Sequence, residues 1–187
     1  VRAQIFAVPE KDPDAIIVGL NDRDPTYHDV YKISISSGKR DLLIQNTQKV
    51  GAWIYDRSGN VRLAYRQKDD GGNEILRVDG KDLTRIYETS YLEDATPVGF
   101  DPDEKRVYLE TNKGDDVDLS RLELLDPASG KTEVVESDPE KQVDFGSAEF
   151  DEQTHELMAT AYVGDRLRIY PRTERARQDL ARMRKKL

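Results

Sequence analysis

The sequence predicts an all-β fold with one helix at its carboxyl end. Short runs of β-branched and aromatic residues alternate with polar residues at a period of two, and the gaps between runs hold Gly, Pro, Asp and Asn. Helical periodicity is absent before residue 174. Two sequence landmarks also recur every 42 to 50 residues, which indicates a repeated structural unit.

Fifteen runs have the strand pattern, in three groups of four and a last group of three. They cover residues 2–8, 15–20, 29–35, 41–45, 50–56, 61–66, 74–79, 83–89, 97–101, 106–111, 120–126, 132–137, 147–151, 156–163 and 166–171. Turn residues separate consecutive runs, so we expect each strand to pair antiparallel with the next.

The first landmark is the link between the third and fourth strands of a group. It reads SSGKRDLL at 36–43, VDGKDLTRI at 78–86 and PASGKTEVV at 127–135. Its glycines, Gly38, Gly80 and Gly130, are 42 and 50 residues apart. The link therefore marks one position in each of three repeats.

The second landmark is an aspartate at the end of the first strand of a group. It occurs in WIYDRSGNVRLAY (53–65), VGFDPDEKRVYLE (98–110) and AEFDEQTHELMAT (148–160). These residues, Asp56, Asp101 and Asp151, are 45 and 50 residues apart. In such a turn the carboxylate accepts backbone N–H groups two residues on, so we interpret all three as turn formers and not as general acids.

Four antiparallel strands in every 40 to 50 residues are typical of a β-propeller blade. We predict complete blades at about 1–46, 50–90 and 95–138, and a fourth blade of three strands at 143–171. Propellers usually close with at least four blades, and single-domain ones with more. The whole chain, 1–187, is therefore expected to be one partial propeller domain with open edges, through which it could self-associate.

The predicted helix, 174–187, follows Pro171 and Thr173, which are suitable entry residues. Its apolar residues form one narrow stripe, namely Ala176, Leu180, Met183 and Leu187. The helix stands where the outer strand of the fourth blade would begin. We expect this stripe to dock on the sheet and cover its open edge, so that Leu180→Asp or removal of the helix would lower stability.

Charge is distributed unevenly. The 187 residues carry 29 Lys and Arg against 37 Asp and Glu, a formal net charge of −8. Residues 172–187 alone carry +5, which leaves −13 on the rest. An acidic total argues against nucleic-acid binding, and no apolar run is long enough for a membrane span. We interpret the basic tail as a solvated helix against an acidic face; the alternative is a segment that binds nucleic acid or an anionic membrane.

The sequence offers little catalytic chemistry. The absence of cysteine excludes disulfides, thiolate metal sites and a thiol nucleophile, and two histidines, His28 and His155, are too few for a multi-histidine metal site. No Gly-x-Ser-x-Gly elbow occurs, and the nearest string, FGSAEF at 145–150, begins a predicted strand. Phosphate- and dinucleotide-binding glycine motifs are also absent. We predict no catalytic residue and no cofactor.

Two acidic clusters, NDRDP at 21–25 and KGDDVD at 113–118, have side chains suited to calcium. Neither matches an EF-hand loop, so we interpret them as acidic turns and predict no metal site. The segment KDDGGNE at 68–74 is typical of a plain hairpin.

Several stretches resemble the N-terminal propeller of the prolyl-oligopeptidase family of serine peptidases, of the dipeptidyl aminopeptidase and acylaminoacyl peptidase type. The resemblance begins in IIVGLNDRDPTYHDVYKISISSGKRDLLIQN (16–46), with Asn-Asp-Arg-Asp-Pro, His-Asp-Val-Tyr and a Ser-Gly-Lys turn. It continues in GAWIYDRSGNVRLAYR (51–66), FDPDEKRVYLETN (100–112) and the segment 149–187. These later motifs are shared with other propellers, including periplasmic TolB-like ones.

The resemblance implies a role and no catalytic residue. In this family the propeller covers an α/β-hydrolase domain that carries the Ser, Asp and His, and it limits access to short peptides. That hydrolase domain is the implied partner, and peptides are the implied substrates. Tyr27, His28 and Asp29 match the family motif. We interpret them as residues that hold the 21–31 hairpin, with substrate contact as the alternative.

Two other functions stay open. The chain could be a stand-alone propeller that binds a protein or peptide partner, or a propeller enzyme that binds carbohydrate or an ion. The sequence does not decide between a cytoplasmic and a periplasmic location.

Overall fold

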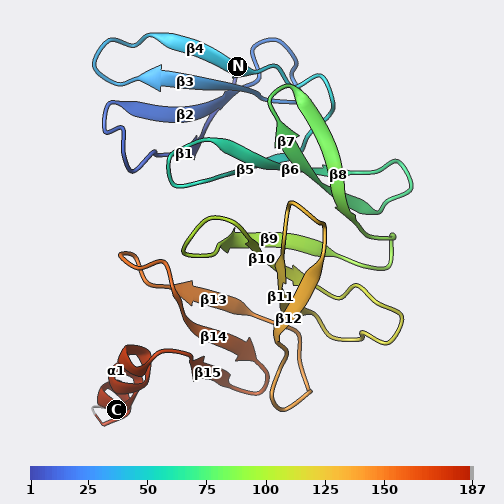
Figure 1. Ribbon diagram of the computed structural model, residues 1–187, viewed down its shortest axis with the longest axis vertical. Helices are drawn as coiled ribbons and strands as arrows, with labels where there is room; N and C mark the ends of the chain where they lie inside the picture. Colours follow the sequence, from blue (N-terminus) through green and yellow to red (C-terminus); the bar gives the residue numbers. More distant parts are fainter. Residues whose placement is uncertain (186–187) are drawn as a thin grey trace. The chain divides into compact units, whose positions relative to one another are not determined.

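The computed structural model describes residues 1–185 and contains fifteen strands and one helix (Figure 1). Lys186 and Leu187 lie outside the described residues. All fifteen predicted strands are present, and the prediction of an all-β fold with a C-terminal helix is confirmed. No helix in the described part of the chain is both long and apolar enough to span a membrane.

The strands form four antiparallel sheets in chain order. The first sheet contains β1 (Ala3–Ala7), β2 (Ala15–Leu20), β3 (Asp29–Ser34) and β4 (Arg40–Ile44). The second contains β5 (Ala52–Tyr55), β6 (Val61–Gln67), β7 (Asn73–Asp79) and β8 (Asp82–Glu88). The third contains β9 (Ala95–Phe100), β10 (Val107–Thr111), β11 (Arg121–Leu125) and β12 (Thr132–Glu136). The fourth contains β13 (Ser147–Phe150), β14 (Leu157–Val163) and β15 (Leu167–Pro171).

Each sheet is a simple meander in which every strand pairs with its sequence neighbours. In every sheet, the pairing between the first and second strands contains a register shift, for example between Ile5 and Ala7 and between Tyr108 and Leu109. Register shifts also occur between the third and fourth strands of the first three sheets. The central pairs run without one. Such irregularities increase the local twist of the outer strands, which is characteristic of strongly twisted blades.

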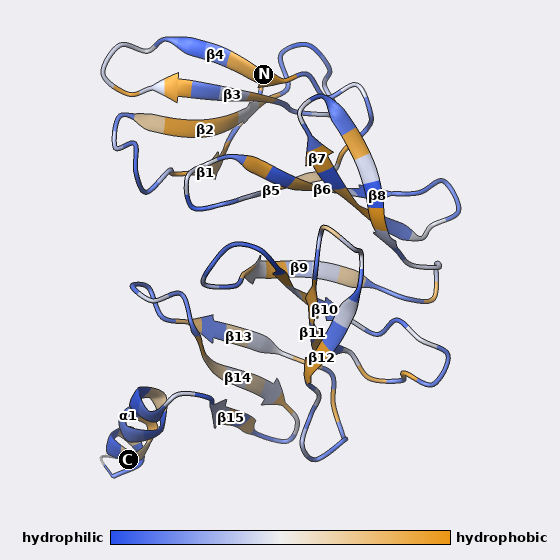
Figure 2. Ribbon diagram, viewed as in Figure 1, coloured by the Kyte–Doolittle hydropathy of each residue, from blue (hydrophilic) through white to orange (hydrophobic). Residues whose placement is uncertain are grey.

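The chain divides into two compact units, Val1–Tyr91 and Leu92–Leu187. In the first unit, the first two sheets pack through Phe6, whose ring stacks on Tyr55 with a centroid separation of 6.0 Å. Val50, Ala64 and Leu76 form a buried cluster on the second sheet. The middle strands supply most of the buried side chains, and Figure 2 shows β2 as a largely hydrophobic strand.

The second unit has its own core. Leu122, Phe145, Leu157 and Tyr162 form a buried cluster that joins the third and fourth sheets. The rings of Phe145 and Tyr162 meet edge to face, with centroids 5.9 Å apart. Each unit thus buries apolar residues between two neighbouring sheets.

Helix α1 (Glu174–Arg184) begins as predicted, but it docks weakly. The side chain of Thr173 accepts a hydrogen bond from the backbone N–H of Ala176, which is a standard N-cap. None of the residues of α1 is buried, and Met183 is 54% exposed. The expectation that the stripe docks on the sheet therefore holds only in part: Leu180 is half-buried beside Ile169 and Tyr170, Met183 is mostly exposed, and Leu187 lies outside the described residues.

The reason for this weak docking is composition. Arginines flank the apolar stripe, and α1 is almost entirely hydrophilic in Figure 2. Leu180 and Ala176 are the half-buried residues of the stripe. Ion pairs connect the segment 172–184 to the sheets: Arg172 donates to Glu136, and Arg175 Nη1 lies 2.9 Å from Asp151 Oδ2. The interpretation that the basic tail lies against acidic groups of the same chain is confirmed for these two arginines.

Candidate functional site: a polar hollow beside the 21–28 loop

Asp29 is the most constrained member of the Tyr27–His28–Asp29 motif. It is 2% exposed and accepts hydrogen bonds from Nε and Nη2 of Arg23 at 2.8 and 2.7 Å. It also accepts from the backbone N–H of Asn46 at 2.7 Å, while Arg23 Nη2 donates to the carbonyl of Asn46 at 2.9 Å. Arg23 first, and the N–H of Asn46 with it, lower the pKa of Asp29 although burial opposes them.

This network joins the β2–β3 loop to the segment that leads from the first sheet to the second. The amide of buried Asn46 completes it, because its nitrogen donates to the carbonyl of Val50 at 2.8 Å and its oxygen accepts from the N–H of Val50 at 3.0 Å. These contacts support the structural role that we favoured for Asp29 from the sequence, since its buried carboxylate accepts three hydrogen bonds from within the chain.

Tyr27 and His28 have separate surroundings. The backbone N–H groups of Thr26 and Tyr27 donate to Asp24 Oδ1 at 2.8 and 3.3 Å, so Asp24 shapes the loop. The ring of His28 meets the edge of Phe6 with centroids 6.1 Å apart. Tyr27 instead lines a hollow next to the loop, which makes it the motif residue with access to a ligand.

The hollow measures about 600 Å³ and lies within the first unit. Its lining is mainly polar and comprises Tyr27, Gln48, Lys49, Gly51, Arg66, Gln67, Lys68, Asp69 and Glu74. Glu74 is 7% exposed and accepts from Arg66 Nε at 2.7 Å. Arg66 Nη1 also donates to the carbonyl of Gln48 at 3.0 Å, so the wall of the hollow is held rigidly.

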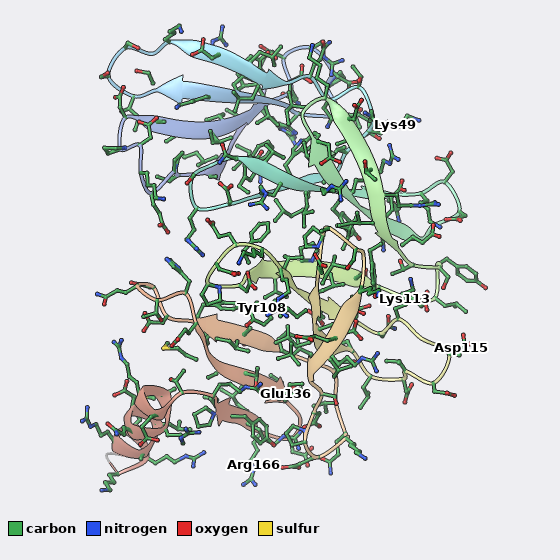
Figure 3. The ribbon with its side chains drawn as sticks, in the orientation of Figure 1. Lys49, Tyr108, Lys113, Asp115, Glu136 and Arg166 are labelled. Carbon is green, nitrogen blue, oxygen red and sulfur yellow. The ribbon has the colours of Figure 1, made fainter. Side chains whose placement is uncertain are left out.

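Lys49 stands at the rim of this hollow and is labelled in Figure 3. Its φ of 58° lies in the left-handed region, where non-glycine residues are uncommon. The ammonium groups of Lys49 and Lys68 and the phenol of Tyr27 can donate hydrogen bonds to carbonyl or carboxylate oxygens of a ligand. Arg66 and Glu74 are paired with each other and are not placed for proton transfer. The hollow can therefore bind a polar group, and its chemistry is that of binding.

Sequence reasoning identified Tyr27 but missed the rest of the hollow. Arg66 and Glu74 are direct cross-strand partners in β6 and β7. The sequence contains a signal for this pair. When the two strands that flank the KDDGGNE hairpin are aligned antiparallel, Arg66 faces Glu74, and opposite charges pair well across strands. The hairpin itself is confirmed: the N–H of Lys68 donates to the carbonyl of Gly72 at 2.7 Å, and Gly71 has a φ of 89°.

The three landmark aspartates are turn formers, as predicted, although the expected donor two residues on is found at Asp151, whereas Asp56 and Asp101 accept from residues four or five on. Asp56 Oδ1 accepts the N–H of Asn60 at 2.8 Å. Asp101 Oδ1 accepts those of Lys105 and Arg106, both at 3.0 Å, and Asp151 Oδ1 accepts those of Gln153 and Thr154, both at 2.8 Å. All three aspartates are buried. The landmark glycines also occupy equivalent turns, with φ of 69°, 67° and 72°.

His28 and His155 do not form a catalytic arrangement with Ser147 of the FGSAEF segment. His28 packs in the first unit, and His155 in the second has a left-handed φ of 59° in the turn that Asp151 shapes. Its backbone N–H donates to the carbonyl of Asp151 at 2.8 Å. Ser147 is the first residue of β13, so FGSAEF is a strand entry and not a strand-to-helix elbow.

The acidic clusters serve as loops. In 21–25, Asp24 accepts two backbone N–H groups, and in 113–118 the N–H of Val117 donates to the carbonyl of Gly114 at 3.1 Å. Within residues 1–185, no group of three or more His, Cys, Asp and Glu side chains is placed to hold a metal ion.

Two carboxylates with several polar partners in the second unit, Glu136 and Asp138, were also missed by sequence reasoning. Glu136, which is labelled in Figure 3, accepts hydrogen bonds from Thr160, Tyr162 and Arg172. Asp138 accepts the N–H of Gln142 at 2.9 Å and Arg168 Nη2 at 2.8 Å. Burial acts to raise the pKa of Asp138, but its backbone donors and Arg168 outweigh burial and lower it. Both carboxylates tie the third sheet to the fourth.

Comparison with known proteins identifies relatives of this chain, although no family model matches it. Dipeptidyl aminopeptidase BIII of Pseudoxanthomonas mexicana is 31% identical over 172 residues, which cover 89% of this chain and 24% of that protein. Dipeptidyl peptidase family member 6 of Caenorhabditis elegans is 29% identical over 58 residues, 31% of this chain and 8% of that protein. The chain thus spans about a quarter of the length of the first relative.

Among solved structures, TolB from Acinetobacter baumannii has a TM-score of 0.61 at 15% sequence identity, over 90% of this chain and 40% of that one. This likeness shows the fold, and the prediction of a partial β-propeller is confirmed. The sequence match confirms the resemblance to the N-terminal propeller region of the dipeptidyl-aminopeptidase type of prolyl-oligopeptidase-family peptidases.

Proposed function

We propose that this chain is a non-catalytic propeller segment of a dipeptidyl-aminopeptidase-type serine peptidase, and that it restricts the access of peptides to a hydrolase domain outside the chain. The observation that carries the proposal is the match of 89% of this chain to a quarter of a curated dipeptidyl aminopeptidase. The absence of an elbow serine from the sequence is consistent with a segment that leaves the chemistry to another domain.

The structure supports a rigid role over a catalytic one. The buried carboxylates are engaged by internal donors, as Asp29 is by Arg23 and Asn46, and Asp138 by Arg168 and its own turn. A rigid set of sheets is suited to exclude folded proteins, because exclusion by size needs an opening that does not deform. In this proposal the hollow beside Tyr27 is a surface that a peptide backbone can contact, and not a reaction site.

The test has two parts. The gene that encodes this chain is read downstream for a Gly-x-Ser-x-Gly elbow, and the complete gene product is assayed on a dipeptidyl p-nitroanilide. We expect the elbow to be present, the complete product to be active and the 187-residue chain alone to be inactive. Turnover by the purified chain alone, or a complete product without an elbow, would contradict the proposal.

The access-limiting role needs its own measurement. One polypeptide, offered to the complete product both folded and unfolded, should be processed from its amino terminus only when unfolded, while the p-nitroanilide is cleaved in either mixture. Equal processing of the folded and unfolded forms would leave the peptidase assignment intact and remove the gating role.

A further inference from the structure

We propose that a groove between β4 and the second sheet binds the carboxyl-terminal end of an extended apolar peptide. The groove measures about 430 Å³ and belongs entirely to the first unit. It is lined by residues 42–48 on one side and by Trp53, Val78, Gly80, Lys81 and Leu83 on the other. This site adjoins the polar hollow beside Tyr27, with which it shares Gln48, and it does not depend on the proposed peptidase function.

The first argument is the open edge of β4. Among the described residues, β4 pairs with β3 alone, and its register is shifted between Val30 and Tyr31. A run of consecutive residues, 42–48, lines the groove. The backbone groups of Asn46 and Gln48 in this run are bonded to Asp29, Arg23 and Arg66, so the open edge lies in β4 itself, at residues 42–44. Unpaired backbone N–H and C=O groups on an edge strand are the groups to which an added peptide strand bonds.

The second argument is the apolar lining. Leu42 and Leu43 are 51% and 45% exposed, although leucine is ordinarily buried. Trp53, Val78 and Leu83 form the facing wall and pack against the buried cluster of the second sheet. The indole N–H of Trp53 is buried and finds no acceptor among residues 1–185. An occupant with apolar side chains matches this lining, whereas the buried indole N–H is not exposed to the groove.

The third argument is charge. Lys81 is the one charged residue among the described residues that line the groove, and no carboxylate lines it. This is unusual in a chain that carries 37 Asp and Glu. A terminal carboxylate satisfies this cation while the preceding residues extend along β4. Strand addition, apolar pockets and capture of a terminal carboxylate are established elements of peptide recognition.

The chain provides its own reporter, because Trp53 is its single tryptophan. The 187-residue chain at pH 7.5 is titrated with acetyl-Leu-Thr-Val-Thr-Leu bearing a free carboxylate, and separately with the carboxyl-terminal amide of the same peptide. We expect a saturable shift in tryptophan emission, and about fivefold tighter binding of the free acid, which corresponds to a partly exposed ion pair.

Matched variants separate the parts of the site. Lys81→Gln should abolish the preference for the free acid, whereas Lys131→Gln should keep it, because Lys131 follows Gly130 as Lys81 follows Gly80 in the equivalent turn. Leu43→Asp should abolish binding of both peptides, whereas Val134→Asp, on the outer strand β12, should not. Far-UV circular dichroism identifies a variant that fails to fold. If Leu43→Asp fails to fold, Leu43→Thr replaces it, and we expect it to weaken the binding of both peptides.

Three results would overturn the proposal. The first is an emission spectrum that neither peptide changes. The second is equal affinity for acid and amide, or a preference that survives Lys81→Gln. The third is an emission shift that depends on protein concentration without peptide, because a second copy of the chain would then occupy the groove.

Discussion

At the scale of single residues, the landmark aspartates are structural because each satisfies backbone donors in a buried turn. We predict that Asp101→Ala lowers the free energy of unfolding by about 1–3 kcal/mol, since it leaves the N–H groups of Lys105 and Arg106 without their acceptor. Asp103→Ala, whose side chain is 55% exposed in the same turn, should change it by less than about 0.5 kcal/mol. Urea denaturation of both variants measures the difference, and equal effects would refute the turn role.

The pKa of Asp29 gives a prediction about pH. Arg23 and the N–H of Asn46 lower this pKa below its ordinary value of 3.8 in the folded chain. The stabilisation is therefore present above that value and is lost as the pH falls through the lower folded-state pKa. Asp29→Asn should be less stable than the parent chain at pH 7, and the gap should narrow below pH about 4.

The measurement is urea denaturation at a series of pH values, with Asp22→Asn as the matched control. Asp22 is an exposed residue of the same loop, so its variant should follow the parent chain throughout. A gap between Asp29→Asn and the parent chain that is constant from pH 7 to pH 3 would show that the interaction with Arg23 does not stabilise the fold.

At the scale of elements, the sequence predicted what local geometry determines. Period-two alternation locates a strand, and an Asx turn involves only neighbouring residues, so the strands and the roles of Asp56, Asp101 and Asp151 were accessible. The register shifts between strands were not, because they depend on pairing. The hollow was missed for the same reason, since it joins Tyr27 to Arg66 across two sheets.

The segment around α1 shows how a local pattern can mislead. The stripe of Ala176, Leu180 and Met183 predicted apolar docking, but none of these side chains is buried, and Arg172 and Arg175 pair with Glu136 and Asp151. The ion pairs could not be predicted, because Glu136 and Arg172 are 36 residues apart in the chain.

Two arginines of this segment differ in the burial of their partners. The side chain of Glu136, which pairs with Arg172, is 11% exposed, whereas that of Glu174, which pairs with Arg177, is 70% exposed. Removing a partner from a nearly buried charge is costly, while exposed pairs contribute little. We predict that Arg172→Ala lowers the free energy of unfolding by about 1–3 kcal/mol, and Arg177→Ala by less than about 0.5 kcal/mol. Urea denaturation of both variants measures the two losses. A larger loss for Arg177→Ala than for Arg172→Ala would show that other contacts hold the segment.

At the scale of the whole molecule, every sheet ends in strands that pair on one side only, within the part of the chain that the structure describes. Several carry exposed apolar side chains, such as Leu43, Val134 and Leu167 at 45%, 55% and 59%. Open apolar edges favour pairing with another chain unless charge prevents it. At pH 7 the net charge of −8 supplies that repulsion.

Near the isoelectric point of about 4.9 the repulsion disappears while the edges remain. We therefore predict that the chain is monomeric at pH 7.5 and self-associates as the pH approaches 5, as measured by light scattering over a concentration series. Val134→Lys, which places a charge on the outer strand β12, should reduce the association, whereas Met183→Lys on the exposed helix should not. Circular dichroism at both pH values tests whether the sheets stay folded. A single particle size from pH 7.5 to pH 5, with the sheets intact, would show that the edges are protected by their own geometry and not by charge.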